Sequence, residues 1–202
     1  MVDTTADFSA GPVLVNPLHG ERIRFLKTVP DTRGEFVQYE SWLHPGGSVG
    51  VPHVHPLQES HFRVLSGMAT FSVDGKRLEL GPGETLSVPP RTPHNLWNAG
   101  SEETHLIIEF RPGLLKQEYY EVVYGLAGDG KHRGWHRNLL QRAVLTAAYH
   151  QESRPLNEPA LVRLGLLLLA PAGRLLGYRA HYPHYCLRVD RPAALPEPGP
   201  AG

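Results

Sequence analysis

Three histidines have the residue type and spacing to bind a metal ion: His53 and His55 in PHVHP, and His94 in PPRTPHNLWN. Side chains on a β-strand point to the same face at every second residue, so the imidazoles of His53 and His55 are expected to share a face. A third imidazole on a neighbouring strand would complete one open face of a metal site. Imidazole suits Zn, Cu, Fe and Ni, and three protein ligands leave positions for water, oxygen or substrate.

The segment that contains these histidines has the pattern of many short β-strands. From Val13 to Phe110, apolar runs of strand length alternate with turn-forming separators such as PDTRG, HPGG and GPG. Asp74-Gly75 is the clearest hairpin turn, because it can supply two positive-φ positions between two alternating runs. Regularly spaced short strands are typical of an all-β sandwich or barrel, which we predict for residues 13–112.

After Pro112 the apolar residues take helical spacing. We expect helices in the segments LLKQEYYEVVYGLA, LLQRAVLTAAYH and EPALVRLGLLLLA. Pro159 would lie near the start of the third helix, and Pro171 should break or kink it. Residues 113–186 are therefore predicted to form a helical extension that packs on the barrel or on a partner subunit.

The composition narrows the classes of function. The chain has 202 residues, with 20 Lys plus Arg against 20 Asp plus Glu, and no basic patch that would predict nucleic-acid binding. The apolar stretch 164–172 is about half of the ~20 residues that span a bilayer, so burial is favoured over membrane contact. The single Cys186 excludes an internal disulfide framework and fits the cytoplasm. Residues 1–12 lack a secretory signal and, like the Pro-rich residues 187–202, are expected to be tails.

Two longer motifs surround the histidines. They read Gly47-x5-His53-x-His55-x3-Glu59, followed by Gly67, and Gly83-x5-Pro89-x-Arg91-x2-His94-x3-Asn98. With one hairpin between them, they resemble the two signature motifs of the cupin superfamily over roughly residues 35–112. The resemblance implies a mainly β fold, a double-stranded β-helix (the cupin jelly-roll barrel) with a metal site inside. Here a C-terminal α-helical extension would follow it.

The acidic ligand of the cupin motif has two candidate positions. Counted forward from His55 it is Glu59, whereas counted back from Gly67 the position is taken by Ser60. Strand alternation agrees with the second count, because Ser60 shares a face with Phe62 while Glu59 lies on the other face. A β-bulge would turn Glu59 inward. Without one, the site has three histidines and no acid, which is the arrangement that we favour.

Other residues are candidates for catalysis or substrate binding. Arg91 stands where the cupin motif has glycine, and its cation would bind a carboxylate or phosphate, or else pair with a surface acid. The candidate catalytic residues are Glu59, His61 and Glu109, each of which could instead face solvent. The candidate pocket-lining residues are Tyr39, Phe62, Leu96 and Trp97, which on strands are otherwise core residues.

Three-histidine cupin sites resemble those of thiol dioxygenases and diketone-cleaving dioxygenases, where iron is the metal. The resemblance therefore implies one divalent metal ion, Fe(II) first, with Zn, Ni or Mn also suited to the ligands. The leading hypothesis is an oxygenase-type enzyme that acts on a small organic molecule, with O2 as co-substrate if the metal is iron. The alternatives are a non-redox Lewis-acid cyclase or isomerase, and a small-molecule-binding or regulatory cupin without catalysis. We also expect a homodimer, because strand edges favour pairing.

Overall fold

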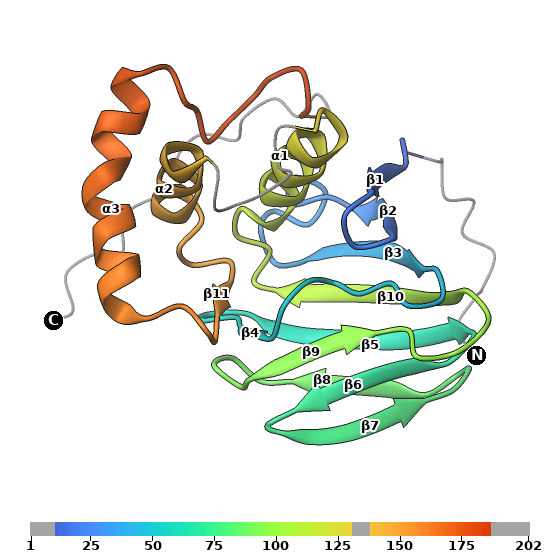
Figure 1. The fold of residues 1–202 in the computed structure, drawn as a ribbon. Helices are drawn as coiled ribbons and strands as arrows, with labels where there is room; N and C mark the ends of the chain where they lie inside the picture. Colours follow the sequence, from blue (N-terminus) through green and yellow to red (C-terminus); the bar gives the residue numbers. More distant parts are fainter. Residues whose placement is uncertain (1–10, 131–137, 187–202) are drawn as a thin grey trace, which may run out of the picture.

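The structure is a computed structural model, and it describes residues 11–130 and 138–186. Two antiparallel sheets face each other and three helices lie together on one side of them (Figure 1). One sheet has the order β1-β2-β3-β10-β5-β8, formed by Leu14–Asn16, Glu21–Lys27, Val37–Leu43, Thr104–Arg111, Glu59–Ser66 and Thr85–Val88. The other has the order β11-β4-β9-β6-β7, formed by Arg154–Pro155, His53–Val54, His94–Trp97, Ala69–Val73 and Lys76–Leu80. The predicted mainly β fold is confirmed.

Alternation along the strands builds the core between the two sheets. In β3 and β10 every second side chain is buried, and the intervening ones are half-buried. In β5 the buried side chains are those of Ser60, Phe62 and Val64, as strand alternation predicts. Strand β10 pairs with both β3 and β5, so its inward residues lie at the centre of the core.

The hairpin between β6 and β7 has the predicted two-residue turn. Val73 pairs with Lys76, and between them Asp74 and Gly75 have φ values of 50° and 78°. Two successive positive φ angles match the right-handed twist of the strands, which explains why Asp-Gly stands at this position.

The helices are α1 (Lys116–Gly128), α2 (Leu139–Ala148) and α3 (Ala160–Leu175). Asn138 caps α2, since its side chain accepts a hydrogen bond of 3.1 Å from the backbone N–H of Gln141. We expected Pro171 to break or kink the third helix, and the break does not occur, because α3 continues to Leu175. Packing on α2 through Leu166, Ala170 and Gly173 holds the helix on both sides of the exposed proline.

Within the described residues, no helix is long and apolar enough to cross a membrane. The predicted tails fall almost entirely on residues 1–10 and 187–202, which lie outside the described residues.

Candidate metal centre

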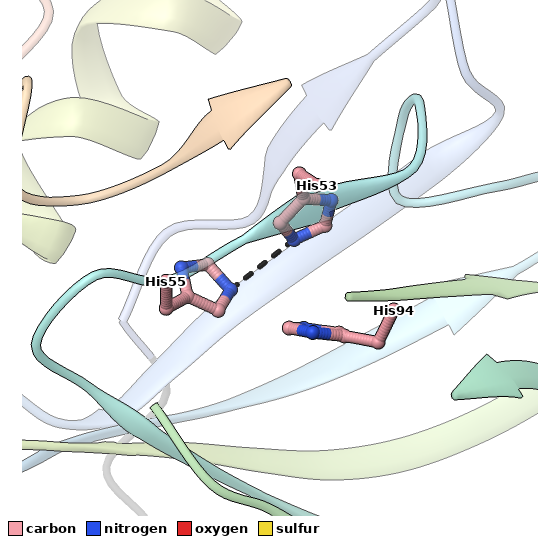
Figure 2. A group of neighbouring side chains, drawn as sticks. All are labelled: His53, His55 and His94. Atoms are coloured by element: carbon pink, nitrogen blue, oxygen red, sulfur yellow. Dashed lines mark hydrogen bonds between the residues drawn. The ribbon is translucent and has the colours of Figure 1, made fainter. Parts of the chain in front are cut away.

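The two motifs bring the three histidines together at one end of the barrel. Strand β4 pairs with β9 so that His53 lies directly opposite His94, and His55 follows β4 on the same side (Figure 2). One nitrogen from each ring lies within 4.8 Å of the others. Nε2 of His53 and Nε2 of His55 are 3.2 Å apart. Three imidazole nitrogens thus converge on one point.

The other nitrogen of each ring is held by a backbone carbonyl. The Nδ1 contacts are His53 to Val51 O at 2.8 Å, His94 to Thr92 O at 2.9 Å, and His55 to Glu152 O. A carbonyl oxygen only accepts hydrogen bonds, so Nδ1 carries the hydrogen in each ring and Nε2 keeps its lone pair. This arrangement fixes the tautomer and the ring orientation that metal-binding histidines need.

Burial also keeps the histidines neutral. It lowers the pKa of His53 to about 3, with a smaller contribution from the neighbouring His94. Burial is likewise the main cause that lowers the pKa of His55 and of His94. A neutral imidazole is the form that binds a metal, so no proton has to be removed near pH 7. The donor set, its convergence and its protonation all fit a divalent metal ion.

A buried pair from the helical extension lies against this face. Lys116, at the start of α1, is fully buried, and its Nζ donates a 3.1 Å hydrogen bond to the backbone carbonyl of Glu152. The same Nζ lies 3.3 Å from Nδ1 of His55 and 4.3 Å from the centre of the Phe110 ring. Burial lowers the pKa of Lys116 to about 8 and raises the pKa of Glu152, while each residue's charge opposes the shift of the other.

Sequence reasoning did not predict this pair. A signal for Lys116 exists, because it lies three and four residues before Tyr119 and Tyr120 and so shares their helix face. Glu152 lies between α2 and β11, and no local pattern marks it as buried.

A cavity of about 600 Å³ lies beside the histidines. Its lining includes His53, His55, Lys116, Tyr119, Tyr149 and Arg163. The first two come from the barrel and the others from the helical extension, so the extension forms part of the wall around the candidate metal face. The volume is in the range of small-molecule sites, which is about 300–1,000 Å³.

The candidate acid and base residues lie away from the histidine cluster. Glu59 and His61 are on the outer face of β5, with Oε2 of Glu59 3.6 Å from Nε2 of His61. Glu109 is on the outer face of β10, where it accepts hydrogen bonds from Gln38 and Arg111. Ser60, which holds the other position for the acidic ligand, is fully buried. Among the described residues, the cluster that could hold a metal contains three histidines and no carboxylate.

The expected substrate-binding residues do not line the cavity either. Tyr39, Phe62 and Leu96 are buried in the core, where the Phe62 ring lies 6.3 Å from that of His94. Trp97 is half-buried and lies 5.8 Å from the guanidinium carbon of Arg77. Arg91 is exposed.

Arg91 has a structural part in the site. It has a φ of 65°, and its backbone N–H donates a 2.8 Å hydrogen bond to the carbonyl of His55. Positive φ is the conformation that favours glycine, the residue that the cupin motif has here. The backbone N–H of Arg91 therefore helps to position His55, which follows the end of β4.

Comparison with known proteins agrees with the fold. Residues 40–110 match the family model of the cupin domain. Residues 40–110 of this chain therefore form a cupin domain.

Among curated proteins, the chain is 32% identical to a probable oxidoreductase, yanE, of Aspergillus niger over 153 residues, or 68% of this chain and 59% of that protein. It is 31% identical to quercetin 2,3-dioxygenase of Bacillus subtilis over 113 residues, or 55% of this chain and 32% of that protein. The chain thus spans between about a third and three fifths of these relatives. Among solved structures, an RmlC-like cupin from Shewanella frigidimarina matches with a TM-score of 0.47 and 23% identity, over 55% of this chain and 96% of that one.

Proposed function

We propose that this protein is a metal-dependent cupin enzyme of the oxygenase type that acts on a small organic molecule. The observation that carries the proposal is the convergence of three neutral imidazoles beside a cavity, each with Nδ1 bonded to a carbonyl. Two relatives support it, since one is named a probable oxidoreductase and the other a quercetin 2,3-dioxygenase.

His53, His55 and His94 would hold the metal through Nε2. A divalent ion bound there supplies a Lewis acid and, if it is Fe(II), the redox partner for O2. Three neutral ligands would leave the full charge of the ion in place, which favours substrates with oxygen or sulfur anions. The helical extension supplies part of the cavity wall beside these histidines.

The first experiment is metal analysis of protein purified without a histidine tag. We expect about one equivalent of metal per chain, with iron supporting the oxygenase, and zinc or nickel indicating the non-redox cyclase or isomerase instead. If the purified protein contains none of these ions and does not bind them when they are added, both the oxygenase and the non-redox enzyme are refuted. Oxygen consumption with diketones, thiols and phenols then tests the oxygenase directly.

The matched variants are His53→Ala and His61→Ala. Removing a residue that hydrogen-bonds to a metal ligand typically lowers metal affinity by about 10–100-fold. Removing the ligand His53 itself should therefore lower metal affinity by at least about 100-fold. His61 lies on the outer face of β5, and its replacement should leave metal affinity unchanged. Equal metal affinity in the two variants would contradict the site.

We also propose that two copies associate through α3. Its outward face carries exposed leucines with no charge among them: Leu161, Leu164, Leu168 and Leu175. Their spacing of three, four and seven residues places them on one stripe, opposite the residues that pack on α2. We expect a dimer in light scattering and a monomer for Leu168→Glu. A wild-type monomer would refute this interface.

A further inference from the structure

The cavity has an excess of positive charge at the end formed by the extension. Arg142 and Arg163 line this end with one carboxylate, that of Glu158, which already accepts a hydrogen bond from Arg142. Arg154 is close enough to Arg163 to repel its charge. Arg163 lines the cavity, and its guanidinium has no hydrogen bond or ion pair with any residue that the structure describes. A half-buried guanidinium with unused donors is suited to a bound anion.

The chain path links this end of the cavity to the candidate metal face. In β11, Pro155 pairs with His53 of β4, and the N–H of Leu156 donates a 3.0 Å hydrogen bond to the carbonyl of Pro52. The segment from there to the first turn of α3 lines the cavity. Within α3, Arg163 is on the inward face, three residues before the buried Leu166. His53 and Arg163 therefore line the same cavity.

Part of the cavity wall is aromatic. Tyr119, Tyr120 and Tyr149 line it, with ring centres 5.6 Å apart for Tyr119 and Tyr120 and 5.4 Å apart for Tyr119 and Tyr149. Flat aromatic surfaces bind planar apolar groups well.

We propose that the cavity binds an aromatic carboxylic acid, with its carboxylate on the guanidinium of Arg163 and its ring against the tyrosines. The opposite end of the ring faces the histidines. The inference names a substrate class for the enzyme proposed above. It rests on that proposed function only for the role of the metal, because the residue that would bind the carboxylate, Arg163, lies on α3. The planar fork of an arginine matches the two oxygens of a carboxylate.

The charges around Arg163 favour an anionic ligand over a neutral one. Burial, followed by repulsion from Arg154, lowers the pKa of Arg163, while the carboxylate of Glu158 opposes this shift. An anion bound beside Arg163 would compensate its positive charge. Arg91, the arginine expected from sequence to bind an anion, is exposed and does not line the cavity.

The test compares two probes of the same shape, 3,4-dihydroxybenzoate and its neutral amide 3,4-dihydroxybenzamide. Their affinities are measured by calorimetric titration of the full chain, both zinc-loaded and metal-free. A hydrogen bond to a charged group is stronger than one to a neutral group, so wild-type protein should bind the carboxylate at least about tenfold more tightly than the amide. Arg163→Gln should remove this preference, and Arg163→Lys should retain part of it.

Arg174→Gln is the control, because Arg174 is exposed on the same helix and lies eleven residues, or about 16 Å, further along it. It should keep the full preference for the carboxylate. A preference below threefold in the wild type, or one that Arg163→Gln retains, would overturn the inference. Failure of the wild type to bind zinc would instead count against the proposed function, while the comparison with metal-free protein would still test the carboxylate site.

Discussion

Glu21 is a carboxylic acid inside the protein, and its stability cost can be calculated and measured. It begins β2, is 2% exposed, and accepts hydrogen bonds from Ser41 at 2.7 Å and from the hydroxyl of Tyr124. Burial raises its pKa from 4.5 to about 7 and outweighs the two hydrogen bonds, which lower it. The side chain is therefore largely protonated at mildly acidic pH in the folded state.

The sign of the effect follows from proton linkage. Between pH 4.5 and 7 the folded state holds a proton on Glu21 that the unfolded state has released, so this contribution to stability is lost as pH rises through that window. One pKa unit corresponds to about 1.4 kcal/mol, which makes the loss about 2–3 kcal/mol between pH 5 and 8.5. The buried histidines have lowered pKa values and change stability in the opposite direction, so the wild-type profile alone cannot isolate Glu21.

The variant Glu21→Gln isolates it. We expect the free energy of unfolding of the variant, relative to wild type, to rise by about 2–3 kcal/mol from pH 5 to pH 8.5, because the amide carries no proton to lose. The assay is urea unfolding of both proteins with chelator present. The control Glu103→Gln removes an exposed carboxylate paired with Arg22, and its relative stability should vary with pH by less than about 1 kcal/mol. A pH-independent difference for Glu21→Gln would refute the reasoning.

The remaining predictions concern backbone conformation. Arg91→Gly should leave stability unchanged or raise it by up to about 1 kcal/mol in thermal unfolding. The reason is that glycine tolerates the φ of 65°, which costs arginine about 1–2 kcal/mol. A clear loss of stability would contradict this prediction. Gly67→Ala should cost more than about 2 kcal/mol, because a Cβ there would lie 2.5 Å from the carbonyl oxygen of Glu103 at a φ of 73°. Gly83→Ala has the same kind of φ and open space, and should cost only about 1–2 kcal/mol, so equal losses would refute the steric argument. Pro171→Ala should stabilise by about 1–3 kcal/mol in urea unfolding, because proline is the poorest residue inside a helix; no gain would indicate that α3 has adapted to it.

The sequence was sufficient to predict features that depend on neighbouring residues. Period-two burial placed Ser60 inside and Glu59 outside, and the turn residues placed Asp74-Gly75 in a hairpin. The two motifs located the histidine cluster because their spacing is fixed by adjacent strands. Lys116, Glu152 and Arg163 could not be predicted in the same way. Their positions depend on how the helices pack at the end of the barrel. The amphipathic pattern of a helix predicts which of its faces is buried, but it does not predict which element that face packs against.

The contacts of Glu152 show that the extension is part of the histidine site. Its backbone carbonyl is the partner of both Nδ1 of His55 and Nζ of Lys116, and its Oε1 accepts a 2.8 Å hydrogen bond from the N–H of Leu115. One residue between α2 and β11 therefore fixes the start of α1 and the ring of a candidate metal ligand together. Any shift of α1 against α2 would change the hydrogen bond that orients His55, and with it the direction of the free Nε2. The orientation of one of the three imidazoles thus depends on helices outside the barrel, so the affinity of the site for metal should respond to substitutions in the extension as well as in the two motifs.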